Sequence, residues 1–499
     1  MSARATTLGE LLRDCEGAAL HGCDASTRFD ALVSDSRKAK TGDVFVALAG
    51  GAHDGHRFVA DVLARGAAAV IVQRDRNVQI DGPHVVVDDT WAALPILAAH
   101  AHGDPGDALR LAGVTGTNGK TTTAHLVGAI LRAAGRAHAR LGTTGNWMVD
   151  HEDRAGFTTP FPIELQALLA DARARGATDV VMEVSSHALA QDRVAPLRYH
   201  AVGLTSFSQD HLDFHPDMAA YLAAKCRLAS TYLRTDGIAV AAVDGQPAAA
   251  EFLAAARGTR WRASRGGDPR AEIRAEAIDF AAAHTRARIE TPMGAIDLRS
   301  PLVGPFYLDN SMVAIGLALG LGVDLAAIAD ALAHSHGAPG RLEPVAVDGV
   351  AGPQVLVDYA HTPDAVERTL AVLRPLARGR LAVVLGCGGD RDPGKRPQMG
   401  AIAGRDADVF YATSDNPRSE PPEQIVDQMI AGVAAAHADR VVREVDRARA
   451  IARAIAAADA SDIVLIAGKG HEDYQEIAGR RHHFDDREHA RAALALRAP

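Results

Sequence analysis

The chain has 499 residues, of which 47% are hydrophobic and 23% charged, and its formal net charge is −9. This length exceeds what one hydrophobic core supports and predicts about three domains. The negative charge, without any cluster of lysine and arginine, argues against nucleic-acid binding. No apolar run approaches the roughly 18 residues of a membrane span, the first residues lack the apolar core of a signal peptide, and the four cysteines show no C-x-x-C spacing. We therefore expect a cytoplasmic protein without membrane insertion, disulfides or a zinc knuckle.

The first region, residues 1–105, alternates short strands with helices. Runs of β-branched residues at 44–48, 68–72 and 84–89 predict strands, and residues 58–66 have helical spacing. The loops on either side of the first of these strands are rich in small polar residues, which could hold a ligand or could simply form turns. The HGDPGD segment at 102–107 is typical of a linker into a second domain.

Residues 113–123, GVTGTNGKTTT, open the second region, residues 106–338. A mostly apolar run at 109–114 leads into them, and a helical pattern follows. A strand, a glycine-rich loop and a helix together cradle a phosphate, because glycines let backbone N–H groups surround an anion at a helix N-terminus. Lys120 would then reach the terminal phosphates, and Thr121 would offer its hydroxyl to Mg²⁺. Val114 stands where the usual G-x-x-x-x-G-K-[ST] pattern has its first glycine.

Polar side chains follow the next two predicted strands. The segment TDVVMEVSSH at 178–187 contains Glu183, two serines and a histidine, and HAVGLTSF at 200–207 runs into SQDHLDFH at 208–215. Ligand sites of parallel α/β sheets lie at the carboxyl ends of the strands, so these side chains are expected beside the phosphate loop. Glu183 suits Mg²⁺, directly or through water. The histidines and aspartates at 208–215 favour a metal or phosphate role over a structural one.

The predicted helix at 217–233 carries Lys225 among alanine, leucine and cysteine. Apolar surroundings lower the pKa of a lysine, and a neutral amine can react with CO₂ to form a carbamate. The residues alone favour the commoner alternative, an ammonium group that extends to solvent. A further strand is expected at 237–245, whereas residues 246–300 show scattered strand patterns and no sign of a site.

The third region, residues 339–499, follows a turn at 337–344 and again alternates strands with helices. Strands are predicted at the start of the segments 354–361, 380–389, 408–418 and 462–472, each of which ends in a polar or glycine-rich loop. A second ligand site is expected where these loops meet. We interpret HEDYQE at 471–476, RRHHFDD at 480–486 and the Ala/Arg-rich helices near 431–457 as solvated faces, and we expect no metal binding at 480–486.

Taken together, these loops resemble the Mur ligases, the ATP-dependent amide-forming enzymes of peptidoglycan precursor synthesis. The resemblance rests on TGTNGKTT, MEVSSHAL, DHLDFH, YLAAK, GRLE, DYAHTPDA, GCGGDRDPGKRP, DNPR and GKGHE, in this order over most of the chain. It implies an α/β protein of three domains: an N-terminal α/β substrate domain at 1–105, a central P-loop ATPase-like parallel sheet at 106–338, and a C-terminal Rossmann-like domain at 339–499. DNPR separates the members that add diaminopimelate from those that add lysine.

The resemblance also implies which residues contact each substrate. Contacts to ATP fall on Gly116, Thr117, Asn118, Gly119, Lys120, Thr121, Thr122, Asn310, Arg341, Asp358, Tyr359 and His361. Contacts to UDP-MurNAc-L-Ala-D-Glu fall on Ser34, Ser36, Gly51, Ala52, His53, Thr158, Thr159, Ser185, Gln191 and Arg193. Contacts to meso-diaminopimelate fall on Arg391, Asp415, Asn416, Pro417, Arg418, Gly468 and Glu472. The implied catalytic residues are Lys120, Glu183, His211 and Lys225, and Lys225 matches the lysine that the family carries as a carbamate, N6-carboxylysine.

The implied reaction begins with transfer of the γ-phosphoryl group of ATP to the D-glutamyl side-chain carboxylate. An amine of diaminopimelate then displaces phosphate from the acyl phosphate. Thr121 and Glu183 would hold one Mg²⁺, and His211 and the Lys225 carbamate a second, because an unmodified ammonium cannot bind a cation. ATP and the amino acid bind different domains, so closure about a hinge near 337–340 would precede chemistry. A monomer is expected.

Two positions depart from the family pattern. Phe157 stands where the family often has Asn before the Thr158–Thr159 pair, which puts one substrate contact in doubt. Tyr307 replaces the inner Asn of an F-N-x-x-N pattern, which changes the expected packing near the adenine.

Other functions remain open from the sequence. A ligase of the same fold could add L-lysine, which DNPR argues against, or could synthesise folylpolyglutamate, which the long N-terminal domain argues against. A P-loop switch or transport ATPase without ligase activity would need no amino-acid pocket. A non-catalytic nucleotide-binding protein is disfavoured, because no key polar position is visibly lost.

Overall fold

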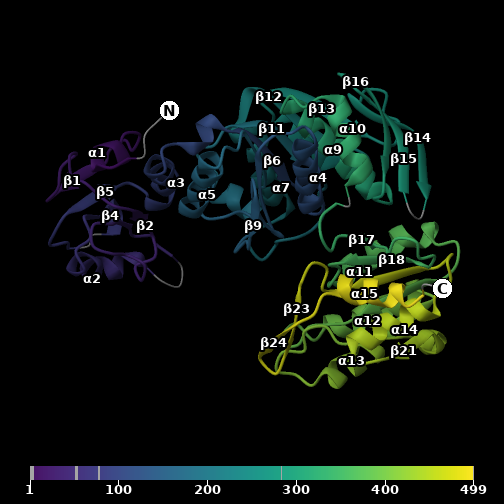
Figure 1. Ribbon diagram of the computed structural model, residues 1–499. Coiled ribbons are helices and arrows are strands. Elements are labelled where there is room, and N and C mark those ends of the chain that lie inside the picture. The colour runs from purple at the N-terminus through teal and green to yellow at the C-terminus, as the bar shows by residue number, and fades with distance from the viewer. Residues whose placement is uncertain (1–4, 51–53, 77–78, 282–283, 336, 498–499) are drawn as a thin grey trace. The chain divides into compact units, whose positions relative to one another are not determined.

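The computed structural model describes residues 5–50, 54–76, 79–281, 284–335 and 337–497. The chain forms two compact units, one comprising Met1–Ile273 with Met312–Ile328 and the other Arg274–Ser311 with Ala329–Pro499. Strands and helices alternate through both (Figure 1), and the three expected domains correspond to an N-terminal, a central and a C-terminal sheet, which confirms the predicted fold class. In the described part of the chain, no helix combines the length and the apolarity needed to cross a membrane.

The N-terminal sheet belongs to the first unit and has the strand order β1-β5-β4-β3-β2. β2 to β5 pair in parallel, whereas β1 is antiparallel to β5. Buried strand residues such as Val46 and Ile71 pack in one core with Leu97 of the long helix α3. The elements are α1 Leu8–Leu11, β1 Ala19–His21, β2 Leu32–Val33, β3 Val44–Val46, η1 Gly55–Phe58, α2 Val59–Ala64, β4 Ala69–Gln73, η2 Arg74–Arg76, β5 His84–Val87 and α3 Thr90–Ala101.

The central sheet of the first unit has the order β13-β12-β11-β6-β10-β7-β8-β9. The strands from β13 to β7 pair in parallel, and β8 and β9 continue as antiparallel hairpins. Since β6 lies between β10 and β11, the carboxyl ends of these three strands meet, with Val114 opposite Glu183. The elements are η3 Pro105–Ala108, β6 Arg110–Thr115, α4 Lys120–Ala133, β7 His138–Gly142, β8 Gly145–Met148, β9 His151–Asp153, α5 Pro162–Ala174, β10 Asp179–Glu183, α6 Ser186–Ala190, β11 Tyr199–Leu204, α7 Met218–Arg227, η4 Leu228–Tyr232, β12 Leu233–Ala242, α8 Pro247–Ala254 and β13 Thr259–Ser264.

The helix predicted at 217–233 differs in its second half. The α-helix α7 ends at Arg227, and η4, a π-helical turn at Leu228–Tyr232, leads directly into β12. Leu228, Ala229 and Tyr232 of this turn are all buried in the core of the central sheet.

The second unit contains an antiparallel meander and the C-terminal sheet, whose order is β17-β18-β22-β19-β20-β21. Within this sheet only β17 is antiparallel to its described neighbour. The meander is β14 Ile273–Ala281, β15 His284–Thr291 and β16 Gly294–Ser300, and the helices α9 Pro305–Gly320 and α10 Leu325–His334 follow it and contribute residues to both units. The remaining elements are β17 Glu343–Val345, β18 Gln354–Asp358, α11 Pro363–Leu373, η5 Arg374–Leu376, β19 Leu381–Leu385, α12 Lys395–Asp406, β20 Val409–Ala412, α13 Pro422–Ile430, η6 Ala435–Arg440, β21 Val441–Arg443, α14 Arg447–Ala457, β22 Ile463–Ala467, β23 Tyr474–Ile477, β24 Arg480–His483 and α15 Asp486–Ala495.

Candidate active site

The phosphate loop has the predicted strand, loop and helix arrangement. β6 ends at Thr115 and α4 begins at Lys120, so the loop is the four residues between them. Gly116 and Gly119 have φ angles of +146° and +88°, which side chains disfavour. A Cβ at position 116 would also lie 2.1 Å from Thr205 Oγ1. The glycine at 116 is therefore required by both conformation and space.

Polar groups of the loop bond to the protein itself. The N–H groups of Thr117 and Asn118 donate to Ser206, to its carbonyl at 2.8 Å and to its hydroxyl at 3.0 Å. Lys120 Nζ donates to the carbonyls of Gly116 and Thr117 at 2.8 and 3.0 Å. The N–H groups of Thr117 and Asn118 and the ammonium of Lys120 are thus occupied by carbonyl and hydroxyl oxygens of the chain.

Glu183, at the end of β10, lies beside the first turn of α4. Its carboxylate accepts from Thr121 Oγ1 at 2.9 Å, and from the N–H and hydroxyl of Thr143 at 2.8 and 3.1 Å. A Cβ on Gly142 would lie 2.3 Å from Glu183 Oε1, so a glycine is needed there to leave room for the carboxylate. Hydroxyl and carboxylate oxygens in contact form the donor set that Mg²⁺ prefers, so Thr121 and Glu183 fit the predicted metal position.

Lys225 is 1% exposed, which excludes the alternative of a side chain extending to solvent. Its Nζ donates to the carbonyl of Gly116 at 2.9 Å and lies 4.4 Å from the ring centre of Tyr221. Burial, and next the nearby ammonium of Lys120, hold the pKa of Lys225 well below its usual value. The amine at this position is therefore more easily neutral than an exposed lysine.

A cluster of aromatic rings surrounds His211. The rings of His187 and His211 are 4.8 Å apart, and His211 lies 5.9 Å from Tyr221, the ring that Lys225 also contacts. Burial is the largest cause that lowers the pKa of His187, His211 and His215. Among the described residues, no group of three or more His, Cys, Asp or Glu side chains has a geometry that could hold a metal ion. Any metal near His211 would therefore need other ligands.

Most of the residues assigned to the UDP-linked substrate gather next to Glu183. The hydroxyl oxygens of Thr158 and Thr143 are 3.1 Å apart. The hydroxyl of Thr159 donates to the carbonyl of Glu183 at 2.9 Å and accepts from the N–H of Ser185 at 3.0 Å. Two further members of the set also contact each other, because the Nε of Arg193 donates to Gln191 Oε1 at 2.7 Å.

The rest of that set is not part of this group. Ser34 and Ser36 follow β2, and no hydrogen bond between described residues joins them to the group. Gly51, Ala52 and His53 lie outside the described residues. Phe157, the first departure from the family pattern, is 53% exposed and packs edge-on against Phe161.

In the second unit, three of the residues assigned to the far wall of the ATP site, Asp358, Tyr359 and His361, lie at or just after the end of β18. The guanidinium of Arg341 is 4.9 Å from the ring centre of Tyr359, which stands 4.5 Å from the ring of His361. Asp358 accepts from two backbone N–H groups at 2.7 and 2.9 Å, and burial raises its pKa. Tyr307, the second departure, donates its hydroxyl to the carbonyl of Arg341, and so joins α9 to this wall.

Asn310 belongs to the same predicted set. It is buried in α9, nearly one turn beyond Tyr307. The residues assigned to ATP therefore all lie in the second unit, except those of the phosphate loop, which belong to the first.

The loops that follow β18, β19, β20 and β22 enclose a cavity of about 380 Å³. Its lining is Tyr359, His361, Gly386, Cys387, Gly388, Arg391, Lys395, Asp415, Asn416, Arg418, Gly468, Glu472 and Tyr474. All of the residues assigned to diaminopimelate except Pro417 line it, and Pro417 lies between two of them. The cavity presents both cationic and carboxylate side chains, which suits a zwitterionic ligand.

Contacts among the cavity residues fix several of them in place. Arg418 has a φ of +50° and donates to the carbonyl of Gly389 at 2.7 Å. Asn416 Nδ2 donates to Glu472 Oε2 at 2.8 Å. Burial raises the pKa of the Cys387 thiol to about 12, so this lining group stays protonated.

Part of the segments interpreted as solvated faces is buried, and that interpretation was wrong there. Arg447 and Asp486 are both fully buried and form two N–H···O bonds of 2.7 Å, and Arg447 also donates to the carbonyl of Ala467. Gln475 donates to the carbonyl of Asp415 at 2.6 Å. These residues, with Lys469, support the cavity loops from behind. Of these residues, only Lys469 belongs to a sequence motif, GKGHE, that could have identified it as a candidate. The strand β24 is exposed, as expected for that part of the segment.

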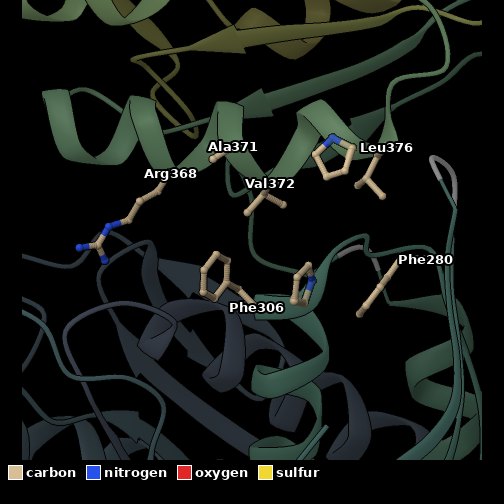
Figure 2. Close-up of a pocket in the computed structure, with 8 residues that line it drawn as sticks. Phe280, Phe306, Arg368, Ala371, Val372 and Leu376 are labelled. Atoms are coloured by element: carbon tan, nitrogen blue, oxygen red, sulfur yellow. The ribbon is translucent and has the colours of Figure 1, made fainter. Parts of the chain in front are cut away.

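A second cavity of the same unit contains no predicted site residue. It has about 460 Å³ and is mostly apolar, with Phe280, Pro305 and Phe306 facing Arg368, Ala371, Val372, Pro375 and Leu376 of α11 and η5. Figure 2 shows Val372 and Leu376 on the opposite side of the space from Phe306.

Three family descriptions match consecutive parts of the chain. Residues 28–102 match "Mur ligase family, catalytic domain", residues 114–318 "Mur ligase middle domain", and residues 340–470 "Mur ligase, glutamate ligase domain".

Similar proteins cover nearly the whole chain. The UDP-N-acetylmuramoyl-L-alanyl-D-glutamate–2,6-diaminopimelate ligase of Gloeobacter violaceus is 45% identical over 469 residues, which are 93% of this chain and 94% of that protein. The protein of the same name from Parasynechococcus marenigrum is 44% identical over 500 residues, at 98% and 99% coverage. A solved structure of a ligase with this name superposes with a TM-score of 0.74 at 33% identity and covers 99% of both chains.

Proposed function

The chain belongs to the Mur ligase family, and on that premise we propose that it adds meso-diaminopimelate to UDP-MurNAc-L-Ala-D-Glu at the expense of ATP. The observation that carries this choice of amino acid is the 380 Å³ cavity. Diaminopimelate has a carboxylate and an ammonium at each end. Arg391 and Arg418 can bind carboxylates, and Asp415 and Glu472 can bind ammonium groups.

The phosphate loop supplies the activating step. A carboxylate is a poor electrophile, so its oxygen first takes the γ-phosphoryl group of ATP, and ADP leaves. Because two anions must meet, catalysis rests on positioning and on neutralising charge. Lys120 would exchange its contacts with the Gly116 and Thr117 carbonyls for contacts with phosphate oxygens. The amine of diaminopimelate then attacks the acyl carbon, phosphate departs, and the amine loses a proton.

Metal binding is a further part of the proposal. Thr121 and Glu183 would hold one Mg²⁺, and His211 a second together with Lys225 once its amine has added to CO₂ and lost a proton. Bound Mg²⁺ supplies positive charge that offsets the charge on the transferred phosphoryl group. The buried, readily neutral amine of Lys225 supports the modification, since only an uncharged amine reacts with CO₂.

The remaining assignments follow the family. We propose domains at 1–105, 106–338 and 339–499, UDP-substrate binding by Ser34, Ser36 and the Thr158–Arg193 group, and a monomer acting in the cytoplasm. The reaction requires the ATP at the phosphate loop to come close to the amino acid in the 380 Å³ cavity, which we call the amino-acid cavity. We propose that residues 337–340 are the hinge of this closure.

One experiment tests the function directly. The purified chain is incubated with ATP, Mg²⁺ and UDP-MurNAc-L-Ala-D-Glu, with and without meso-diaminopimelate, and the products are weighed by mass spectrometry. We expect a product heavier by one diaminopimelate minus water, formed with one ADP per amide. Lys120→Ala should form none while still binding the UDP substrate in calorimetry. Steady ATP hydrolysis without any amide product would instead support a P-loop ATPase.

A further inference from the structure

Lys469 lies immediately behind the amino-acid cavity and is fully buried. It follows Gly468 at the end of β22, and its ammonium faces away from solvent toward the loop that carries Glu472. A buried charge is costly unless it is paired and hydrogen-bonded. The contacts that offset this cost therefore indicate what the residue does.

The ammonium has three acceptors. Lys469 Nζ donates to the backbone carbonyl of Tyr474, and to Glu472 Oε2 and Asn416 Oδ1, each at 3.3 Å. All three partner residues line the cavity, and two of them, Asn416 and Glu472, meet the ammonium with their side chains. One buried cation thus holds two ligand-facing groups at once.

The same contacts decide how the Asn416 amide is turned. Its Oδ1 accepts from Lys469 and from the N–H of Glu476 at 2.9 Å, so its Nδ2 must face Glu472, to which it donates at 2.8 Å. Reversing the amide would place its NH₂ group against two donors. Glu472 Oε2 is consequently occupied by Asn416 and Lys469, and within the described residues no group bonds to Oε1.

We propose that Lys469 is a positioning residue for amino-acid binding, which fixes Glu472 so that its Oε1 is presented to an ammonium group of the substrate. The inference rests on the proposed function and deepens it. Without the lysine, the carboxylate would lose the ion pair that it forms among the described residues and, held on that side by the Asn416 amide alone, would turn more freely. The substrate ammonium would then have to order Glu472 during binding, which weakens binding.

A competing explanation is purely structural, because Lys469 also ties β23 to the loop through the carbonyl of Tyr474. Two variants separate these roles. Lys469→Met removes charge and donor, whereas Lys469→Gln removes the charge but keeps an amide donor on a side chain that is one atom shorter. Arg380→Met controls for the loss of an ion pair elsewhere in the same sheet, since the half-exposed Arg380 pairs with Asp462 at 2.9 Å, at the ends of β19 and β22 away from the cavity.

The test is a double-mutant cycle that combines the Lys469 variants with Glu472→Gln, and its main measurement is KM for meso-diaminopimelate. KM for ATP, KM for UDP-MurNAc-L-Ala-D-Glu, kcat and the melting temperature are measured for the same variants. Because a hydrogen bond to a charged group carries enough free energy for about a tenfold change in binding, we expect both Lys469 variants to raise KM for diaminopimelate about tenfold or more. The other two KM values should stay within about twofold, and Arg380→Met should match the parent chain. In a Glu472→Gln background, where the carboxylate is already gone, the Lys469 changes should raise KM less than about threefold.

Several results would overturn the inference. These are a parent-like KM in both Lys469 variants, an equal rise in the Glu472→Gln background, or parallel rises in all three KM values. If Lys469→Met does not fold, the Lys469→Gln data decide. If the parent chain does not use diaminopimelate at all, the proposed function fails first, and that failure is visible before any variant is made.

Discussion

The phosphate-loop site and the amino-acid cavity are built in opposite ways. At the phosphate loop, Lys120 and Lys225 both donate to the carbonyl of Gly116, and the N–H groups of Thr117 and Asn118 bond to Ser206. In the cavity, charged side chains face an open space and are held from behind by buried groups such as Lys469.

This difference has a consequence for how each site binds. A preformed cavity loses little conformational entropy on binding, whereas a loop bonded to itself must exchange internal contacts for contacts with the ligand. We therefore expect changes at the phosphate site to act on turnover and changes in the cavity to act on KM for the amino acid.

The largest expected effect is at Lys225. Lys225→Ala should lower kcat by about 10³-fold, the size seen when one charge-stabilising group is removed from an active site. Acetate should restore part of the activity, because it can replace the oxygen ligands of the carbamate. Native mass spectrometry of the folded parent protein, kept in bicarbonate near neutral pH, should show the added CO₂. A bare amine in a fully active preparation would contradict this assignment.

Arg418→Ala tests the cavity side of the comparison. Removing one partner of a buried charge pair costs roughly 10²-fold in binding, so KM for diaminopimelate should rise by about that factor. KM for ATP and for the UDP substrate should stay nearly unchanged. Parent-like kinetics with diaminopimelate would show that Arg418 only bonds the Gly389 carbonyl.

Gly142→Ala probes the space around Glu183. The added Cβ would lie 2.3 Å from Glu183 Oε1 and should displace the carboxylate, lowering kcat by about tenfold, as changes behind a metal ligand do. Gly128→Ala is the matched control, because its Cβ would make only an ordinary 3.5 Å contact with His138. Equal activity of the two variants would show that Glu183 tolerates the shift.

The smallest effect concerns stability and pH. Burial lowers the pKa of His187, His211 and His215 below the usual 6.5, so the unfolded chain takes up protons first as the pH falls. The stability that comes from their neutral, buried state is fully present above about pH 6.5, and it is lost as the pH falls through the lower pKa of the folded state. The melting temperature should therefore drop as the pH falls below about 6.5, and less so in His215→Gln. The same change at the exposed His334, on α10, is the control variant.

The sequence predicted the strand, loop and helix around residues 113–123 correctly, because these parts are local. TGTNGKTT is contiguous, and Glu183 ends a strand that pairs directly with β6 in a parallel sheet. The burial of Lys225 could not be decided from the sequence, since its acceptor, the Gly116 carbonyl, lies 109 residues away.

The sequence also did not reveal the buried pair of Arg447 and Asp486 behind the cavity, and the physical reason is the same. Arg447 lies in an Ala/Arg-rich helix whose composition is typical of a solvated face, and its partner Asp486 is 39 residues distant. Burial of a charged residue depends on a partner brought by the tertiary fold, and neither composition nor periodicity records that pairing.

Amino-acid choice tests the account most directly. The chain is given ATP, Mg²⁺, UDP-MurNAc-L-Ala-D-Glu and equal concentrations of meso-diaminopimelate and L-lysine, and the two amide products are counted by mass. A site built for a charged group rejects the analogue that lacks it by roughly 10⁴-fold, so the account predicts the diaminopimelate product almost alone. Comparable amounts of the lysine product would contradict it.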